Sequence, residues 1–323
     1  MKYFLGIDVG SSKTHALIVD ETGQCVGFGK SGGGNHQGVG YDGLTEVLRQ
    51  SFAGARAMAG VELGSIAAAG FGVAGYDFPS DREPHLQSIA VLELACPLEV
   101  VNDGMNGLLA GATHGIGVNV TAGSSNNCRG RGKHGQEGRI VGNGIAFGEF
   151  GGAYEIAARG LQMVNYAWIR RIPPTVLTQI YIEATGAKSE ADLVEGLSSG
   201  QYHLFPYLAV QVIDAARHGD SAACEVIQWA GEELGWLAVA VARQIEMQDE
   251  EVEIIQSGSV FEAGDPIMNP MREVVLKHCP KARLIRLDGP PVVGAVVLGM
   301  EQVGFDGYAI RSEMIQTAKT LVK

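Results

Sequence analysis

The chain has 323 residues, of which 46% are hydrophobic and 19% are charged, so it is long enough for two globular domains and too apolar to be disordered. The formal net charge is −12, because 36 acidic residues outnumber 24 basic ones, and this balance argues against a nucleic-acid partner. No uncharged apolar run approaches the length of a membrane span, and the five cysteines form no C-x-x-C pair. These features favour a reduced, cytoplasmic protein without a membrane partner.

The opening of the chain predicts a strand, a polar turn and a second strand. Apolar residues at 3–7 lead to Asp8, the chain turns at residues 10–12, and apolar residues resume at 15–19. The turn and its flanks read Asp8-Val9-Gly10-Ser11-Ser12-Lys13-Thr14. Small side chains let the backbone N–H groups of such a turn line an anion site, and a carboxylate at a strand end can hold a divalent cation. An ordinary β-hairpin with a polar turn would explain the same residues.

The segments that follow alternate between strands and helices. Predicted strands lie at 25–30, 66–71 and 98–101, and predicted helices begin at Asp42, as N-cap, and span 82–93. A glycine-rich loop at 32–38 carries Asn35, and the strand at 98–101 runs directly into Asn102-Asp103-Gly104. Polar residues at strand ends in a mixed pattern predict an α/β domain whose ligands bind above those ends.

From about residue 117 the pattern restarts. A predicted strand at 118–121 is followed by the turn Gly123-Ser124-Ser125-Asn126, which has the same pattern as Gly10-Ser11-Ser12-Lys13. Further strands are predicted at 127–131 and 139–141. Two such hairpins, each heading one half of the chain, predict two similar domains that face each other across a cleft. We place the first domain at 1–115 and the second at 116–304, with a C-terminal helix at about 305–323 as a candidate to pack back onto the first.

The remainder of the second half is predicted to be largely helical. Helices are expected from Pro173-Pro174 to about Gly186, after a Ser189–Asp192 capping pair, and after Asp220, with a strand at 252–256. A local basic cluster comprises Arg129, Arg131, Lys133, His134 and Arg139. Because the chain is acidic overall, we interpret this cluster as a solvated hairpin tip rather than a binding patch.

The order and spacing of these blocks resemble the actin/hexokinase/Hsp70-type ATPase superfamily, in particular the N-acetylglucosamine kinase branch that also includes activator ATPases of acyl-CoA reductases and dehydratases. The matching blocks are Asp8–Thr14, Gly72–Gly75, Asn102-Asp103, Thr121–Cys128, Gly142-Asn143-Gly144, Gly148-Glu149-Phe150-Gly151, Ser257-Gly258-Ser259-Val260 and Pro290–Ala295. The resemblance covers nearly the whole chain. It implies an α/β fold of two ribonuclease H-like domains, whose mixed sheets flank a cleft for ATP and sugar.

The resemblance also implies roles for individual residues in phosphoryl transfer. The implied ATP contacts are Gly10, Ser11, Ser12, Lys13, Thr14, Gly123, Ser124, Ser125, Asn126, Gly219, Gly258 and Ser259. Asp8 would hold Mg²⁺ through water, and Asp103 would accept the proton of the attacking sugar hydroxyl. A strand-terminal turn is the alternative for Asp103, since Asn-Asp-Gly is a strong turn signal, and a plain tight turn explains Gly258 equally well.

The implied sugar contacts are Asn35, Asn102, Asp103, Gly142, Asn143, Gly144 and Glu149. Two positions depart from the usual pattern of the family, because Glu149 stands where an aspartate is common and Phe150 where a glutamate is common. Both departures leave the identity of the sugar open. Glu149 could instead be an acid at a helix N-terminus, favoured by the helix dipole.

Three functions are compatible with these observations. The first is an ATP-dependent kinase of an amino sugar such as N-acetylglucosamine, glucosamine or N-acetylmuramate, acting as a homodimer. The second is an activator ATPase that holds an iron–sulfur cluster across a dimer, for which the scattered cysteines offer no obvious pair. The third is a non-catalytic sugar-sensing regulator, which ranks last because the first strand begins at residue 3 and leaves no room for a DNA-binding segment.

Overall fold

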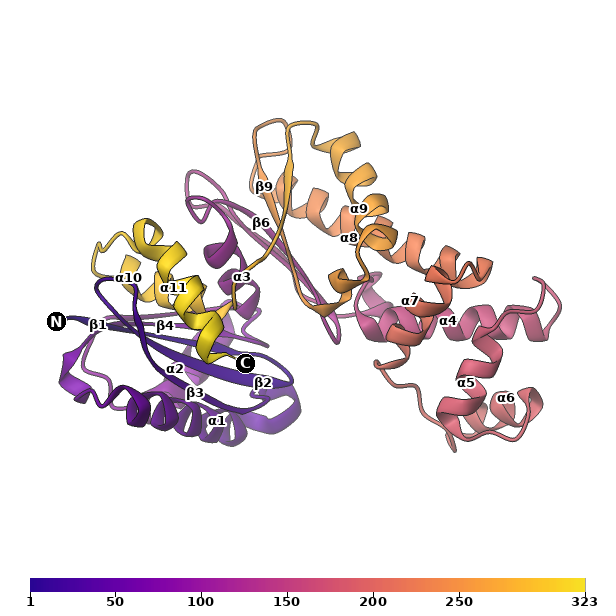
Figure 1. Ribbon diagram of the computed structural model, residues 1–323, viewed down its shortest axis with the longest axis horizontal. Helices are drawn as coiled ribbons and strands as arrows, with labels where there is room; N and C mark the ends of the chain where they lie inside the picture. Colours follow the sequence, from indigo (N-terminus) through magenta and orange to yellow (C-terminus); the bar gives the residue numbers. More distant parts are fainter. Residues whose placement is uncertain (323) are drawn as a thin grey trace.

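The computed structural model describes residues 1–322 and contains two five-stranded sheets, one in each half of the molecule (Figure 1). The first sheet has the order β3-β2-β1-β4-β5. Its strands are β1 (Tyr3–Val9), β2 (Lys13–Asp20), β3 (Cys25–Gly32), β4 (Ile66–Val73) and β5 (Leu98–Val101). β1 is antiparallel to β2 and parallel to β4, and β4 is parallel to β5. The carboxyl ends of β1, β4 and β5 therefore meet at one edge, which is where the sequence places Asp8, Gly72 and Asn102.

The second sheet repeats this arrangement with the order β10-β9-β6-β7-β8. Its strands are β6 (Gly117–Ala122), β7 (Asn126–Arg131), β8 (Glu137–Ile140), β9 (Glu253–Ser257) and β10 (Arg283–Arg286). The helices between β8 and β10 are α4 (Ala153–Trp168), α5 (Leu177–Thr185), α6 (Glu190–Ser198), α7 (Leu208–Arg217), α8 (Ser221–Gln244) and α9 (Asp265–His278). They build one large apolar core with β6, β7 and β9. Helices α4 to α7 lie at the end of the molecule remote from the first sheet (Figure 1).

The first half contains α1 (His36–Ala59), α2 (Arg82–Ala90) and α3 (Asp103–Gly111), and the chain ends with α10 (Val292–Glu301) and α11 (Gly307–Leu321). Short 3₁₀ turns are η1 (Leu63–Ser65), η2 (Pro79–Asp81), η3 (Ile145–Phe147) and η4 (Ser259–Ala263). Figure 1 shows α10 and α11 beside the first sheet, and both helices belong to an apolar cluster with residues of β1 and β2. The sequence-based division put α10 in the second domain, whereas its buried apolar residues pack in one cluster with residues of the first sheet.

Alternation along β1 determines which side chains face which helix. Leu5, Ile7 and Val9 join the apolar cluster that contains α1, whereas Phe4 joins the cluster that contains α10. Because successive side chains of a strand point to opposite faces, Asp8 shares the face of Phe4. This is the face covered by α3 and α10, and the Asp8 carboxylate is thereby directed toward α3.

Helix α3 packs between the two sheets, and its glycines allow the close approach. A Cβ atom on Gly104 would lie 2.8 Å from Arg129 Cγ, one on Gly107 would lie 2.7 Å from the Asn119 amide, and one on Gly111 would lie 2.7 Å from Ile255. On its other side the backbone of Asn106 meets Gly294 of α10. Small residues at these contacts let α3 lie directly against both domains.

Most element boundaries follow the sequence, with one notable exception at α1. The predicted N-cap was Asp42, but the helix begins at His36 and its N-cap is Asn35, whose side chain accepts a hydrogen bond from the Gln37 N–H. Gly40 has φ +69° and interrupts the helix, so Asp42 lies at the start of its longer, regular part. The capping predictions for Ser189 and Asp220 are confirmed.

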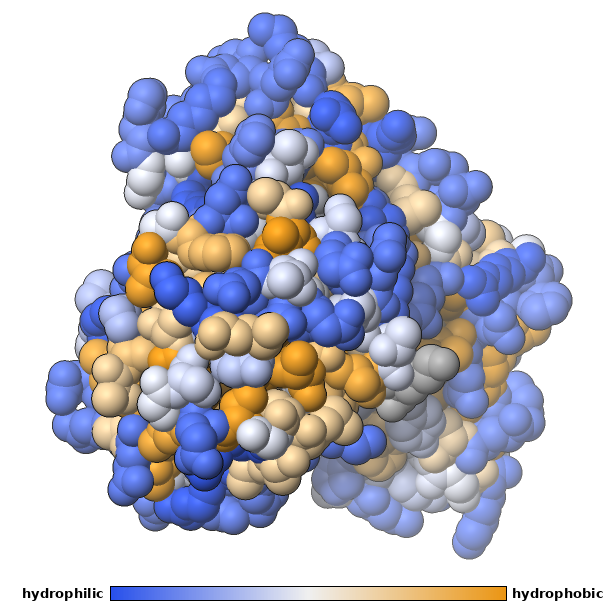
Figure 2. Space-filling view, turned by 60° about the vertical axis from the view of Figure 1, so that its left-hand side comes forward, coloured by the Kyte–Doolittle hydropathy of each residue, from blue (hydrophilic) through white to orange (hydrophobic). Residues whose placement is uncertain are grey.

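Apolar residues are interspersed with polar ones over the face of the molecule that Figure 2 displays. Among residues 1–322, no helix is both long and apolar enough to cross a membrane.

The contact between β1 and α10 yields a stability prediction. A Cβ atom on Gly6 would lie 2.4 Å from the backbone nitrogen of Val296, so Gly6→Ala must push α10 away from the sheet. We expect the variant to lose about 1–3 kcal/mol of unfolding free energy, measured by urea denaturation. Gly64→Ala is the matched control, because nothing lies within 4 Å of the added Cβ atom there. Equal stability of the two variants would contradict this account of the β1–α10 contact.

Candidate functional site

Asp8 lies at the end of β1, on the face that meets α3. Its Oδ1 accepts a hydrogen bond of 2.7 Å from Asn106 Nδ2, and Asn106 is completely buried. Burial raises the pKa of Asp8 to about 6, although the Asn106 hydrogen bond and the charge of Lys13 oppose the shift. Asn106 was not identified from the sequence, but it lies one helical turn after Asp103 and so on the same side of α3.

Asp103 is the first residue of α3. The N-cap of this helix is Asn102, whose Oδ1 accepts a 2.9 Å hydrogen bond from the Gly104 N–H. Burial raises the pKa of Asp103 to about 7, and the neighbouring Asp8 carboxylate adds to the shift while Arg129 opposes it. A carboxylate that titrates near neutral pH is suited to accept a proton from a substrate.

Asn102 itself does not present its side chain to a ligand. The residue is 4% exposed, its Oδ1 also accepts a 2.7 Å hydrogen bond from Asn127, and its Nδ2 donates to Asp77 at 3.1 Å. Both ends of the amide are therefore bonded within the protein. The expectation that Asn102 contacts a sugar does not fit this geometry, because the amide is needed to cap α3.

The first serine turn is held against the loop that follows β3. The Gly10 N–H donates to the Lys13 carbonyl at 2.9 Å, and the Gly34 N–H donates to the Gly10 carbonyl at 3.0 Å. The side chains of Ser11, Ser12 and Lys13 are exposed. Thr14 differs from its neighbours, since it is fully buried and its hydroxyl donates to the Gly32 carbonyl. Its side chain therefore has no access to a nucleotide.

Asn35 connects this turn to the start of α1. Its Oδ1 caps α1 and its Nδ2 lies 3.4 Å from Ser11 Oγ. A Cβ atom on Gly75 would lie 2.6 Å from Asn35 Oδ1, so the loop after β4 closes over the same residue. Asn35, the first serine turn and Gly75 thus form one wall of the candidate site.

The second serine turn is fixed to the N-terminus of α4. The carbonyls of Gly123 and Ser124 accept hydrogen bonds from the N–H groups of Ala153 and Tyr154, at 2.9 and 3.0 Å. The side chains of Ser124 and Ser125 are exposed. The turn is therefore rigid in its backbone while its hydroxyls are accessible.

The residue after this turn differs from the expectation. Asn126 is 2% exposed and directs its amide toward Glu155 Oε2, at 3.4 Å, in the interior of the second domain. Its neighbour Asn127 points to the opposite face of β7, where its Nδ2 lies 3.4 Å from Asp103 Oδ1. The alternation of a strand explains the exchange, because only one of two adjacent asparagines can face the cleft. Asn127 is a site residue that the sequence analysis missed.

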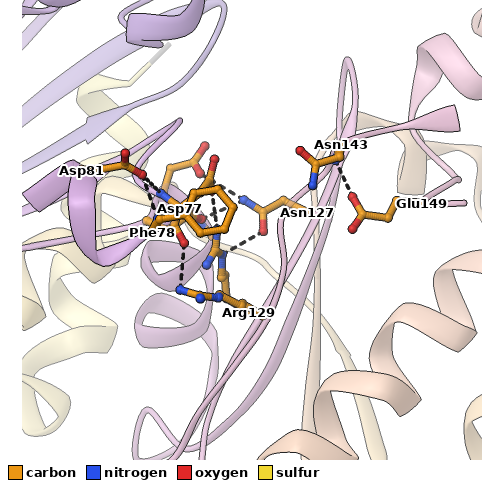
Figure 3. Close-up of polar contacts among 11 residues, drawn as sticks. Asp77, Phe78, Asp81, Asn127, Arg129, Asn143 and Glu149 are labelled. Atoms are coloured by element: carbon orange, nitrogen blue, oxygen red, sulfur yellow. Dashed lines mark hydrogen bonds and ion pairs between the residues drawn. The ribbon is translucent and has the colours of Figure 1, made fainter. Parts of the chain in front are cut away.

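Glu149 and the glycine-rich loop before it lie on the side of the second domain, apart from the Asp77–Arg129 cluster (Figure 3). The Glu149 carboxylate accepts a hydrogen bond from the Asn143 N–H. Gly142 and Gly144 both have positive φ angles, of 84° and 72°, and a Cβ atom on Gly142 would lie 2.2 Å from the Asn126 carbonyl oxygen. The structure thus joins Asn143 and Glu149 in one loop that packs on the second serine turn.

Gly258 and Gly219 lie in the second domain near η4. A Cβ atom on Gly258, where φ is +101°, would lie 2.2 Å from the carbonyl oxygen of Ala122 at the end of β6, and Ser259 is exposed beside it. Gly219 follows α7, and Arg217 of that helix donates to the carbonyls of Glu262 and Ala263 in η4. The turn after α7 and the turn after β9 are therefore held close together.

The interpretation of the basic cluster as a solvated hairpin tip is wrong for Arg129 and Arg131. Arg129 is 6% exposed and its Nη2 lies 2.5 Å from Asp77 Oδ1, while Arg131 pairs with Glu301 of α10 at 2.9 Å. Lys133 and His134 lie at the exposed tip, and Arg139 is also exposed although its Nη1 donates to the Asp77 carbonyl at 2.9 Å. The arginines join the two domains, and the net charge of the chain gave no information about these specific partners.

Asp77, Asn102 and Arg129 also line a cavity of about 450 Å³ between the domains. Asp8, Asp103 and the two serine turns are not among its lining residues. The buried polar residues around Asp77 therefore separate this cavity from the edge of the sheets that carries the carboxylates.

Among residues 1–322, no group of three or more His, Cys, Asp or Glu side chains is arranged as a metal centre. Cys25, Cys128 and Cys279 are buried. The two cysteines with some exposure, Cys96 and Cys224, precede β5 and lie in α8, and so belong to different halves of the chain. This separation gives no support to a shared iron–sulfur cluster ligated by two neighbouring cysteines.

The chain is similar to proteins that are named as sugar kinases. An N-acetylmuramic acid/N-acetylglucosamine kinase of Clostridium acetobutylicum is 25% identical over 304 residues, covering 94% of this chain and 99% of the relative. An N-acetyl-D-glucosamine kinase of Dictyostelium discoideum is 26% identical and covers 92% and 97% of the two chains. A solved structure described as a putative N-acetylglucosamine kinase from Chromobacterium violaceum has a TM-score of 0.71 at 21% identity, over 92% of this chain and 99% of that one.

A ROK family glucokinase from Streptomyces griseus, solved with glucose and AMPPNP, superposes with a TM-score of 0.58 at 18% identity and covers 93% and 99% of the two chains. The predicted two-domain actin/hexokinase-type fold is therefore confirmed. Residues 5–299 match the BadF/BadG/BcrA/BcrD ATPase family, and the chain belongs to that family.

Proposed function

We propose that this chain is an ATP-dependent kinase that phosphorylates a hydroxyl group of an amino sugar, N-acetylglucosamine or a close relative such as glucosamine or N-acetylmuramate. The observation that carries the proposal is the half-buried Asp103 carboxylate, with a pKa near 7, at the edge where both domains present a serine turn. The two curated relatives, which match over almost their whole length, support the same substrate class. The proposal further includes a homodimer in the cytoplasm with no nucleic-acid or membrane partner.

The two serine turns are proposed to hold the phosphates of ATP from opposite sides. Ser11, Ser12 and Lys13 would act from the first domain, and Ser124 and Ser125 from the second, through hydroxyls and backbone N–H groups. Gly219, Gly258 and Ser259 are proposed to line the nucleoside end, where the turns after α7 and β9 are held together. Thr14 and Asn126 are left out of this set because their side chains are buried.

The donor set at Asp8 fits a divalent cation such as Mg²⁺. One carboxylate oxygen accepts the Asn106 hydrogen bond, and the burial that raises the pKa of this carboxyl group to about 6 also favours a bound positive charge. Asp8 would hold the cation, directly or through water. When bound, the cation would neutralise charge on the transferring phosphate groups.

The sugar is proposed to lie between Asn35 on the first domain and the loop that contains Asn143 and Glu149 on the second. Asp103 accepts the proton of the attacking hydroxyl, whose oxygen forms a bond to the γ-phosphorus of ATP while the bond to the β–γ bridging oxygen breaks and ADP leaves. The raised pKa of Asp103 matches this task, because a weakly basic carboxylate of pKa 4 would hold the proton poorly at neutral pH. Gly142 and Gly144 shape the loop through their positive φ angles.

Asp103→Asn tests the proton-accepting role. The amide preserves size and polarity but cannot accept the proton, so we expect turnover to fall by about 10²–10⁴-fold while nucleotide affinity stays within a factor of about three. Sugar-dependent ADP release measures turnover, and calorimetry measures nucleotide affinity. The matched control is Asp42→Asn, an exposed aspartate of the same domain. Turnover in Asp103→Asn above about a tenth of the wild-type value would remove this residue from the role.

The raised pKa of Asp103 also predicts a pH dependence. Because the group must be ionised to act, kcat/KM should fall about tenfold per pH unit below pH 7. In the ligand-free protein the folded pKa lies above the unfolded value of 3.8, so the native state binds the extra proton. The stability contributed by the protonated group is therefore lost as the pH rises from about 4 to about 7. Thermal unfolding should show Asp103→Asn gaining stability over the wild type between pH 5 and pH 8, and a constant difference would contradict the shift.

The ionised carboxylate of Glu149 is proposed to accept hydrogen bonds from hydroxyl groups of the sugar. Glu149→Gln keeps an acceptor for the Asn143 N–H but loses charge assistance, which is worth about 1.5–3 kcal/mol for a bond to an ionised group. We expect kcat/KM to fall roughly ten- to 150-fold with the best sugar. Glu149→Asp should retain activity. Wild-type kcat/KM in Glu149→Gln would limit this side chain to the shaping of its own loop.

A further inference from the structure

Four residues close a ring of hydrogen bonds next to Asp103. Arg129 donates from Nη2 to Asp77 Oδ1 at 2.5 Å and from Nε to Asn127 Oδ1 at 3.2 Å. Asn127 donates from Nδ2 to Asn102 Oδ1 at 2.7 Å, and Asn102 donates from Nδ2 to Asp77 Oδ1 at 3.1 Å. Figure 3 shows Asp77, Asn127 and Arg129 gathered at this point.

The ring is buried and spans the two domains. Asp77 follows β4 and Asn102 precedes α3, whereas Asn127 and Arg129 both come from β7 of the second sheet. Asp77, Asn102 and Arg129 are each no more than 6% exposed. Asp81 fixes the backbone of Asp77 by accepting its N–H at 2.9 Å, and Arg139 donates to the Asp77 carbonyl at the same distance. The ring is thus attached to both domains by side-chain and backbone contacts.

Arg129, together with the Asn102 oxygen that the Gly104 N–H fixes as an acceptor, determines which way the Asn127 amide is turned. A guanidinium can only donate, so its Nε–H requires the oxygen of Asn127 to face it. The Nδ2 group must then face the other way, where it donates to Asn102 and lies 3.4 Å from Asp103 Oδ1. In the flipped orientation the amide oxygen would face the carboxylate of Asp103, and two acceptors would be opposed.

We propose that Arg129 is a positioning residue for phosphoryl transfer, which acts by holding the Asn127 amide in the orientation that donates to Asp103. The inference rests on the proposed role of Asp103. Asp77 serves as the counter-ion that keeps the Arg129 guanidinium in place between the domains. Arg129 contacts neither ATP nor sugar in this scheme, and its effect passes through Asn127.

The test compares two conservative substitutions on the same strand. Arg129→Lys keeps the positive charge beside Asp77, but a single ammonium group cannot reproduce the fixed pair of donors toward Asp77 and Asn127. Arg131→Lys is the matched control, because Arg131 also lies on β7 and pairs across the domains, with Glu301, yet has no contact with Asn127 or Asp103. Both substitutions should lower the melting temperature.

We expect kcat to fall about 10- to 100-fold in Arg129→Lys with KM for ATP within about threefold, and kcat to stay within about twofold in Arg131→Lys. The double variant Asn127→Ala/Arg129→Lys should be no slower than Asn127→Ala alone, since the arginine acts through the asparagine. Equal kcat values in the two lysine variants, or additive effects in the double variant, would overturn the proposal.

A second measurement separates this inference from the proposed function. The ¹⁵N-labelled side-chain amide of Asn127 should give two distinct, slowly interconverting proton signals in the wild type and in Arg131→Lys. These signals should shift toward the positions of a solvent-exposed asparagine amide in Arg129→Lys, because the amide can then turn about its Cβ–Cγ bond, while the two protons stay distinct since rotation about the C–N bond is slow. Unchanged Asn127 signals in Arg129→Lys would overturn the inference that Arg129 orients this amide. A wild-type protein that phosphorylates no amino sugar would overturn the proposed function alone.

Discussion

The placement of two carboxylates, Asp8 and Asp103, at one edge of the first sheet is the constraint on which the rest of the site depends. Each is partly removed from water, and the charge of Asp8 raises the pKa of Asp103. Burial of two like charges is unfavourable unless donors compensate, and the donors here come from Asn106, the N-terminus of α3 and Asn127. Helix α3 must therefore approach both sheets, which explains its glycines at the contacts with β6, β7 and β9.

The features that could be predicted from the sequence are those set by local patterns. Strand β5 was predicted with its observed limits, and the repeated serine turn correctly indicated two similar halves. The position of Asp8 and Asp103 at strand ends placed both at the same edge of the sheet, because parallel strands align their carboxyl ends. Strand alternation could also have shown that Asn127 rather than Asn126 faces Asp103. Asn126 shares a face of β7 with Cys128, which is buried in the core, whereas Asn127 shares the opposite face with Arg129.

The features that could not be predicted depend on partners remote in the chain. Nothing near Arg129 in the sequence indicates Asp77, which lies 52 positions away and in the other domain. A basic run in an acidic chain is usually solvated. Arg129 is buried instead, because it pairs with the buried carboxylate of Asp77. The same limit applies to α10, which follows the second domain in sequence yet covers β1 and β4, because its position is fixed by contacts with residues remote in the chain, such as those at Gly6 and Gly70.

The two serine turns are alike in sequence but are anchored to different structures. The first is held by the loop between β3 and α1, through the Gly34 N–H, and thereby moves with Asn35. The second is held by the N-terminus of α4 and by the loop at Gly142, and so moves with Asn143 and Glu149. Each turn is rigid with respect to its own sheet, and so the spacing between them is determined by contacts that join the domains. Helix α3 and the Asp77–Arg129 pair supply those contacts beside Asp103, which links the geometry of both turns to the environment of this carboxylate.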